Sequence, residues 1–174
     1  DGSLLSASVV MYGMLWLFQE GSFINEYRQA ALEKPSPLSA AFSLDYFRSL
    51  AAVPGSARLS LKALLATEQQ IPGLGNGVLQ DILWAAGCNP RRRTESLSEA
   101  ELNYLYDSLQ QTLQTMVNLG GRDSERDLHG VTGGYRTRMS TIHAAEGCPR
   151  CGSPIVREAY LGGSVYYCPR CQPK

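Results

Sequence analysis

The chain has 174 residues, of which 44% are hydrophobic and 18% charged, as is ordinary for a soluble globular protein of one domain or two small ones. Its 16 basic and 16 acidic residues cancel, so the chain as a whole carries no net positive charge that would indicate a nucleic-acid partner. A local excess, eight Lys or Arg against five Asp or Glu, is confined to residues 120–174. No apolar run approaches the roughly 18 residues of a membrane span, and no secretion signal is recognisable.

The N-terminal segment is predicted to form a β-hairpin. Residues 4–18 (LLSASVVMYGMLWLF) favour strands, with Gly13 as a turn or bulge and Glu20-Gly21 as a second turn. Two strands alone are marginally stable in water, so this hairpin requires a sheet that the rest of the chain does not visibly supply. The Pro-rich break at residues 34–37 ends the segment, and the pattern after it is helical.

Four helices are predicted between this break and residue 121, over residues 44–52, 59–69, 77–86 and 99–119. The last is the clearest. Ser98 and Glu101 form a capping box at its start, leucines repeat at helical spacing along it, and Gly120-Gly121 ends it. Residues 122–147 have the pattern of a loop, and short strands are expected after them. The fold class is therefore α+β.

Two Cys-x-x-Cys pairs indicate a metal site. They are separated by 16 residues, whose composition suits a β-hairpin around Gly162-Gly163. Four thiolates satisfy a tetrahedral Zn²⁺ with no open position, which favours one structural zinc ion over catalysis. Two disulfides or free thiols are the alternative. The predicted ligands are Cys148, Cys151, Cys168 and Cys171.

The turn Ile71-Pro-Gly-Leu-Gly-Asn76 lies between two predicted helices. Its glycines allow a close backbone approach, and the free N–H groups of the helix that begins at Asn76 attract an anion such as phosphate. Lys62, on the preceding helix, could reach the same anion. The alternative is that Asn76 only caps its helix, and the turn alone does not decide between the two.

Together, these features resemble the formamidopyrimidine-DNA glycosylase and endonuclease VIII family, in the order and spacing of their motifs over nearly the whole chain. The matching features, most specific from Leu59 onward, are Lys62 followed by the Gly-Leu-Gly-Asn turn, Asp81 in place of the usual Glu, GGRDSERD at residues 120–127, Gly134-Tyr135, and CPRCQ at residues 168–172. The resemblance implies a partial β-sandwich remnant at residues 1–34, a helical helix–two-turn–helix DNA-binding domain at 35–145, and a four-cysteine zinc-finger β-hairpin at 146–174.

The resemblance also implies which residues contact DNA. Lys62 and Asn76, with Gly75 in the same turn, would hold phosphates that flank a lesion, and the zinc-finger hairpin would reach the minor groove. Tyr135 would lie near the extruded base, since chemistry on a stacked base is blocked. Tyr12 falls where the family places a wedge in the vacated stack, although a buried strand residue is an equal alternative.

Two departures from the family pattern affect function. The family usually has an Arg five residues before the third zinc ligand, where this chain has Gly163, so that contact is expected to be lost or moved to Arg157 or Arg170. The family's chemistry resembles attack on the sugar C1′ by an N-terminal proline amine, whereas this chain starts Asp1-Gly2. We therefore assign no catalytic residue here and expect a fragment that cannot perform the glycosylase and lyase steps.

The main hypothesis is a base-excision DNA glycosylase with AP lyase activity that binds damaged double-stranded DNA as a monomer in the bacterial cytoplasm, near the nucleoid. A non-catalytic DNA-binding module on the same scaffold and a zinc ribbon within an interaction or translation factor are the alternatives. Cys88 is expected to be a buried thiol, and His129 and His143 loop residues. The run Arg91-Arg92-Arg93 is expected to be a solvated turn, with a phosphate-facing patch as the other interpretation.

Overall fold

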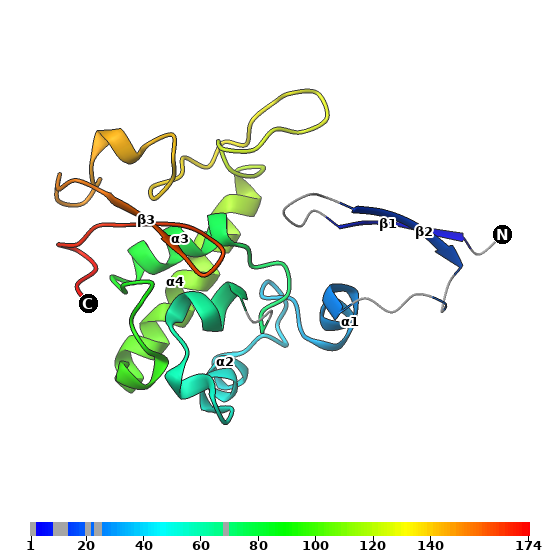
Figure 1. Ribbon diagram of the computed structural model, residues 1–174, viewed down its shortest axis with the longest axis horizontal. Coiled ribbons are helices and arrows are strands. Elements are labelled where there is room, and N and C mark those ends of the chain that lie inside the picture. Colours follow the sequence, from blue (N-terminus) through cyan, green and yellow to red (C-terminus); the bar gives the residue numbers. More distant parts are fainter. Residues whose placement is uncertain (1–2, 9–13, 20–21, 23–25, 68–69) are drawn as a thin grey trace.

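The structure is a computed structural model of the chain, and it describes residues 3–8, 14–19, 22, 26–67 and 70–174. An antiparallel hairpin of β1 (Ser3–Ser8) and β2 (Met14–Gln19) opens the chain and pairs Ser3 with Gln19. This hairpin and helix α1 (Glu26–Glu33) lie to one side of the main helical body (Figure 1). The predicted hairpin is confirmed. Gly13 and the Glu20-Gly21 turn lie outside the described residues. Helix α1 was not predicted from the sequence.

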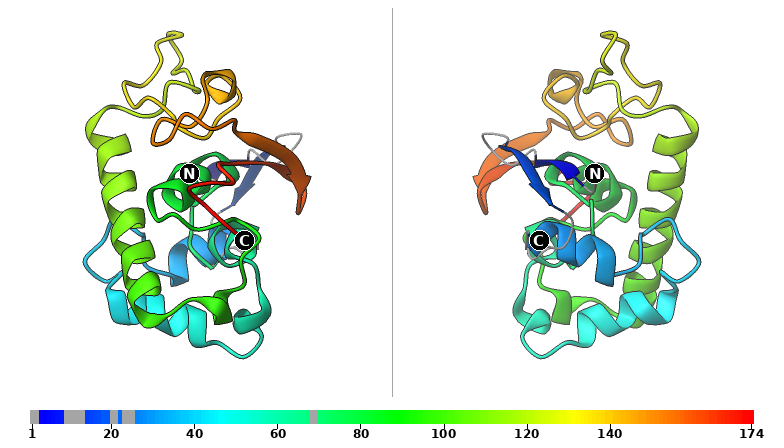
Figure 2. Two further views of the ribbon diagram at one scale, coloured as in Figure 1. Left: turned by 90° about the vertical axis from the view of Figure 1, so that its left-hand side faces the viewer. Right: turned by 90° about the vertical axis from the view of Figure 1, so that its right-hand side faces the viewer.

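Three α-helices form the main body, and their bounds agree closely with the predictions. They are α2 (Leu44–Ala52), α3 (Asn76–Ala85) and α4 (Glu99–Asn118). The capping box predicted at the start of α4 is present, with Ser98 Oγ accepting from Glu101 N and the Glu101 carboxylate accepting from Ser98 N. Figure 2 shows α4 along one side of the molecule and the C-terminal hairpin on the other.

The helix predicted over residues 59–69 was wrong in its start and its form. Ser60 pairs with Arg93 in an isolated β-bridge, and residues Ala63–Thr67 form a π-helix. The first turn is held from outside, because Leu61 N donates to Arg92 O and Lys62 N to Pro90 O. Short 3₁₀ turns at Ser56–Arg58, Thr94–Ser96 and Ala144–Glu146 join the larger elements.

Helix α3 lies at the centre of the fold. Leu79, Ile82 and Leu83 are buried on its apolar face and pack with α2 and α4 in the main hydrophobic core. Two polar residues of α3, Gln80 and Asp81, are also buried, so this helix has partners on a second face. None of the helices in the described part of the chain is long and apolar enough to cross a membrane.

A second hairpin closes the chain. Strands β3 (Val156–Tyr160) and β4 (Gly163–Tyr167) pair antiparallel, and the two residues between them, Leu161 and Gly162, both have positive φ, of 46° and 74°. Positive φ at both positions is the geometry of a type I′ turn, which matches the twist of the strands. The predicted hairpin is confirmed, and Gly163 opens β4 beside this turn.

Candidate functional site

The four predicted cysteines come together between the helical body and the C-terminal hairpin. Their Sγ atoms all lie within 4.8 Å of one another, with 3.8 Å between Cys148 and Cys171 and 3.5 Å between Cys151 and Cys168. A tetrahedral zinc with Zn–S bonds of about 2.3 Å places its sulfurs about 3.8 Å apart, whereas a disulfide requires about 2.05 Å. The geometry therefore fits one structural zinc ion.

Electrostatics give the same result. Burial, and then hydrogen bonds with the neighbouring thiols, raise the pKa of Cys171 to about 12, because four crowded sulfurs cannot all ionise unaided. Hydrogen bonds with Ser153 lower the pKa of Cys151 to about 6. A divalent cation removes this conflict, since it binds all four groups as thiolates.

Helix α3 is joined to the hairpin by amide side chains. Asn76 Nδ2 donates to Ser164 O over 2.9 Å, and Gln80 Nε2 donates to the same carbonyl over 3.2 Å. Gln80 Oε1 accepts from Tyr166 N. Beyond α3, Asn89 Nδ2 donates to Gln172 O over 3.0 Å. The zinc finger is therefore attached to the helical body by buried polar contacts.

The structure brings Lys62 and Asn76 together at the hairpin tip, beside Gly163. A Cβ added at Gly163 would lie 3.3 Å from Asn76 Nδ2 and 3.6 Å from Lys62 Nζ. Lys62 is only 2% exposed and its ammonium group donates to Tyr160 O, so burial lowers its pKa. Asn76 Oδ1 is buried without a hydrogen-bond partner among the described residues. Gly75, exposed, immediately precedes α3 in an extended conformation.

The other predicted contact residues lie elsewhere. Arg157 is exposed on β3, with its Nε donating to Ser164 Oγ over 3.4 Å, and Arg170 is exposed between the last two cysteines. Tyr12 lies outside the described residues. Tyr135 is only 8% exposed and its hydroxyl bonds the carboxylate of Asp81, so the phenol faces the interior and not solvent.

Asp81 fixes the loop that follows α4. Its carboxylate accepts from Arg138 N over 2.9 Å and from Met139 N over 2.7 Å, besides the Tyr135 hydroxyl. Burial raises the pKa of Asp81, against the effect of these hydrogen bonds. The sequence identified Asp81 only as a family position, because nothing local shows that its partners lie 57 and 58 residues further along.

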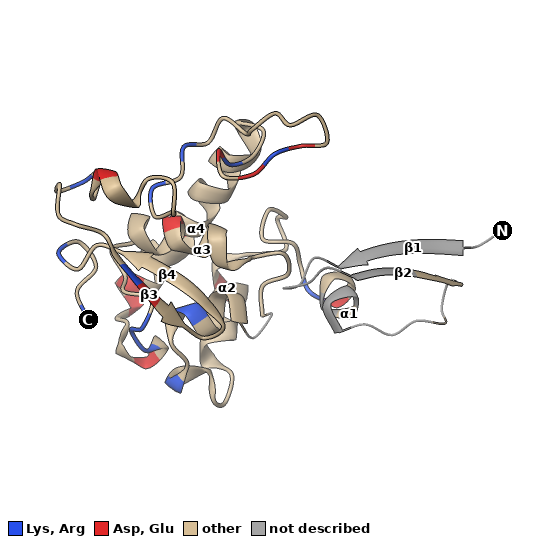
Figure 3. Cartoon of the chain, turned by 45° about the horizontal axis from the view of Figure 1, so that its top comes forward, with Lys and Arg blue, Asp and Glu red and all other residues tan. Residues whose placement is uncertain are grey.

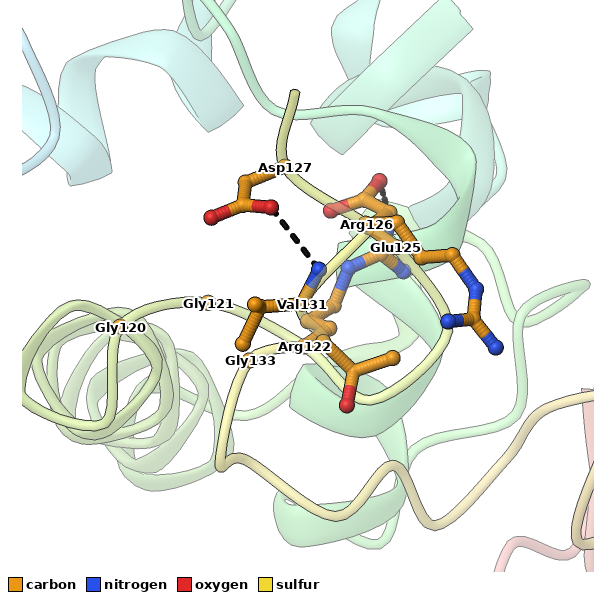
Figure 4. A pocket seen from close by; sticks show the side chains of 9 residues that line it. Gly120, Gly121, Arg122, Glu125, Arg126, Asp127, Val131 and Gly133 are labelled. Atoms are coloured by element: carbon orange, nitrogen blue, oxygen red, sulfur yellow. Dashed lines mark hydrogen bonds and ion pairs between the residues drawn. The ribbon is translucent and has the colours of Figure 1, made fainter. Parts of the chain in front are cut away.

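The loop itself encloses a cavity of about 280 Å³ (Figure 4), lined by Gly120, Gly121, Arg122, Glu125, Arg126, Asp127, Val131, Thr132 and Gly133. Asp127 Oδ1 accepts from Val131 N over 2.8 Å and holds the loop closed on itself. The Arg122 guanidinium pairs with Glu125 and packs on Gly77 of α3, where an added Cβ would clash with Arg122 Nη1. Basic and acidic residues are interspersed along this loop (Figure 3).

The loop also contains a cluster of one histidine and two carboxylates that was not predicted from the sequence. His143, expected to be an ordinary loop residue, lies between Asp123 and Glu146, with its ring nitrogens 2.7 Å from one carboxylate oxygen of each. Hydrogen bonds with Glu146 and then Asp123 raise the pKa of His143. The spacing of His143 and Glu146 was a possible signal, but Asp123 is 20 residues away.

The Arg91-Arg92-Arg93 run is ion-paired. Arg91 Nε is 2.6 Å from a Glu158 oxygen, Arg92 Nη1 is 2.5 Å from Glu101, and Arg93 Nη1 is 3.4 Å from Glu95. Carboxylates therefore already compensate these three charges. Cys88, as predicted, is buried, and it packs in the main core.

Residues 34–127 match the family described as "Formamidopyrimidine-DNA glycosylase H2TH domain", and residues 146–174 match "Zinc finger found in FPG and IleRS". A formamidopyrimidine-DNA glycosylase of Thermus thermophilus is 39% identical over an alignment of 145 positions, which covers 79% of this chain and 52% of that protein. One from Heliobacterium modesticaldum is 32% identical over 177 residues, covering 99% of this chain and 62% of that protein. The chain spans roughly half to two thirds of the length of these relatives.

Solved structures agree with these matches. The MutM (Fpg) protein of Thermus thermophilus superposes with a TM-score of 0.76 at 34% identity, over 92% of this chain and 61% of that one. The Lactococcus lactis Fpg in complex with DNA that contains an abasic site superposes with a TM-score of 0.74 at 26% identity, over 94% of this chain and 59% of that one. The chain therefore belongs to the formamidopyrimidine-DNA glycosylase family, of which it carries the H2TH domain and the zinc finger.

Proposed function

We propose that the protein containing this chain is a DNA-repair glycosylase with AP lyase activity, and that these 174 residues grip the damaged duplex. The observation that carries the proposal is the meeting of Lys62, Asn76 and the zinc-finger hairpin at one point, in a chain of this family. The proposed division is a β-sandwich remnant at residues 1–34, a helical DNA-binding domain at 35–145 and the zinc finger at 146–174. Cleavage chemistry is assigned to none of these residues.

Within this grip, Asn76 and Gly75 at the start of α3 offer an amide and free backbone N–H groups to a phosphate. The Lys62 ammonium group donates one hydrogen bond to the Tyr160 carbonyl and keeps two further N–H donors for a phosphate. Arg157 and Arg170, both exposed, are the candidates to replace the guanidinium that Gly163 lacks. Tyr135 acts on the extruded base indirectly, by holding its loop to Asp81.

Binding of a fluorescent duplex with an abasic-site analogue tests the grip. We expect Asn76→Ala to weaken binding about tenfold, as expected for loss of a charge-assisted hydrogen bond. Asn118→Ala is the matched control, because Asn118 is exposed at the end of α4 and bonds only Gln114 among the contacts described. Equal affinities for the two variants would refute the assignment of Asn76.

Salt dependence tests Lys62 separately. If Lys62 contacts a phosphate, Lys62→Met reduces the slope of log K against log salt by about 1. A slope that does not change would make Lys62 a residue that only holds the hairpin.

Borohydride trapping of the protein that contains this chain, on damaged DNA, distinguishes the enzyme from a non-catalytic DNA-binding module on the same scaffold. Only a protein that forms a Schiff-base intermediate is trapped.

We further propose that the protein acts as a monomer in the bacterial cytoplasm, near the nucleoid, where its DNA is found. This rests on the bacterial relatives and on the DNA-bound neighbours. Sedimentation of the 174-residue chain at micromolar concentration should give the mass of one copy, 19.0 kDa. A mass of two copies would contradict the monomer.

A further inference from the structure

Trp84 of α3 lies directly against a zinc ligand. Its indole Nε1 is 3.4 Å from Cys148 Sγ, within the range of an N–H···S hydrogen bond. Cys148 is 3% exposed and belongs to a small buried cluster with Met139, Tyr166 and Cys168, against which Trp84 packs. The indole N–H therefore points at a sulfur in a site that is largely closed to water.

Arginines hold the ring in this orientation. Arg150, which lies between the first two cysteines, places its Cζ 4.7 Å from the ring centroid, and Arg138 lies over the same ring at 5.9 Å. Arg150 Nη2 also donates to Ala85 O over 3.2 Å, so the first Cys-x-x-Cys turn is joined to the last turn of α3 beside Trp84. Cation–π contacts of this kind favour one ring position.

We propose that Trp84 tunes the zinc site through an N–H···S hydrogen bond to the Cys148 thiolate, and so links zinc binding to helix α3. Four thiolates give a zinc site a net charge of −2, and a donor aimed at one sulfur stabilises that charge. Residues that donate to metal ligands commonly change metal affinity 10- to 100-fold when removed.

With this hydrogen bond, helix α3 contacts the zinc finger at two places, the hairpin and the first cysteine pair. Asn76 and Gln80, in its first turns, hold the hairpin, and Trp84, in its last turn, holds the first cysteine pair. The inference rests on the zinc finger and the fold, and it stands whether or not the proposed DNA repair activity is correct.

Zinc affinity, measured by competition with a chromophoric chelator, tests the hydrogen bond. We expect Trp84→Phe, which keeps an aromatic ring but lacks the N–H, to raise the Kd for Zn²⁺ by 10- to 100-fold. Tyr166→Phe is the matched control, because it removes a polar hydrogen from the same cluster, where Tyr166 bonds Thr141 Oγ1 and no sulfur. Its Kd should stay within about twofold of the wild-type value.

The Co²⁺-loaded protein gives a spectroscopic readout that a packing role would not change. Loss of a donor to a thiolate raises the energy of the sulfur electrons, so the thiolate-to-cobalt charge-transfer band of Trp84→Phe should move to lower energy, while the tetrahedral d–d bands remain. A band and a Kd that both match the wild type would overturn the proposal.

A third measurement does not depend on the folding of Trp84→Phe. The chain has two tryptophans, so Trp16→Phe leaves one indole N–H for ¹⁵N NMR. Exchange of Zn²⁺ for Cd²⁺ should shift that resonance, because its acceptor is bonded to the metal. An indole resonance that does not move on metal exchange would contradict an N–H···S contact.

Discussion

The molecule contains two antiparallel hairpins of similar size but very different support. Strands β1 and β2 pair with each other over six positions, and Leu17 of β2 is 74% exposed, in a hairpin set to one side of the helical body. Strands β3 and β4 pair over five positions, yet Val165, Tyr166 and Tyr167 are buried. The second hairpin also has hydrogen bonds to α3 and four cysteines at its base.

The difference teaches that strand pairing alone does not fix a hairpin in place. A two-stranded ribbon is marginal in water, so its stability comes from what covers one face or ties its ends. For β3–β4 these are a metal and the amide side chains of α3. For β1–β2, the side chain of Leu17 is exposed.

Loss of the metal should have the largest effect. Cys168→Ser removes one of four ligands, and because zinc binding supplies much of the folding free energy of such a module, we expect β3–β4 to unfold while β1–β2 is unchanged. Zinc content and the backbone amide NMR spectrum measure both outcomes. Cys88→Ser is the control, since Cys88 packs in the core and is not among the four clustered cysteines, so that variant should keep its zinc.

Removal of the attachment to α3 should have a smaller effect. Gln80→Ala deletes an amide that donates to the partly buried Ser164 O and accepts from the buried Tyr166 N, and we expect a loss of about 1–3 kcal/mol in the free energy of unfolding. Urea unfolding measures this loss. Gln114→Ala, which removes an exposed amide on α4, should change stability by less than about 0.5 kcal/mol. Equal effects of the two variants would show that the Gln80 amide does not contribute to holding the hairpin.

A pH titration should separate the loop before the zinc finger from both hairpins. The pKa of His143 is raised by Glu146 and Asp123, so its stabilising charge is fully present below about pH 6.5 and is lost as pH rises through the raised value. Hydrogen bonds with His143 lower the pKa of Glu146, a contribution lost in acid. Loop protection in hydrogen exchange should therefore be greatest between about pH 4.5 and 6.5. In His143→Gln we expect the alkaline part of this dependence to disappear; its persistence would exclude His143 as the cause.

The smallest effect is expected in the N-terminal hairpin. Leu17→Ser changes a side chain that is 74% exposed, so the free energy of unfolding should move by less than about 0.5 kcal/mol in urea. A loss above about 1 kcal/mol would mean that Leu17 packs against a neighbour, and the contrast between the two hairpins would fail.

Features set by short-range chemistry were predictable from the sequence. The capping box of α4, the glycines that end it and the spacing of the two cysteine pairs each involve residues within a few positions, and each is present. The meeting of Lys62 and Asn76 was an expectation from the turn and the segment before it, to which the family resemblance added the role of holding phosphates. The zinc ligands needed no resemblance, because two Cys-x-x-Cys turns can point at one centre.

Features set by contacts between distant segments were not predictable. Lysine is usually found at the surface, but Lys62 is buried against Tyr160, which lies 98 residues away in the sequence. Its burial therefore leaves no pattern in the residues around it. The same holds for the hydroxyl of Tyr135, which lies in the loop after α4 and turns inward to Asp81 of α3. The π-helix at Ala63–Thr67 is preceded by two residues whose backbone N–H groups donate to residues 90 and 92, contacts that periodicity within the segment does not report.

The Arg122 guanidinium that packs on Gly77 has a consequence for engineering. Replacing a helical glycine with alanine commonly stabilises a protein by roughly 0.5–1 kcal/mol, and Gly77, in the first turn of α3, would be chosen for such a change. Here the added methyl group would clash with Arg122 Nη1, which is the far end of a flexible side chain, so the guanidinium would move and the backbone of α3 would stay in place. Because Arg122 also lines the Gly120–Gly133 cavity, Gly77→Ala would change one wall of that cavity, more than 40 positions further along the chain.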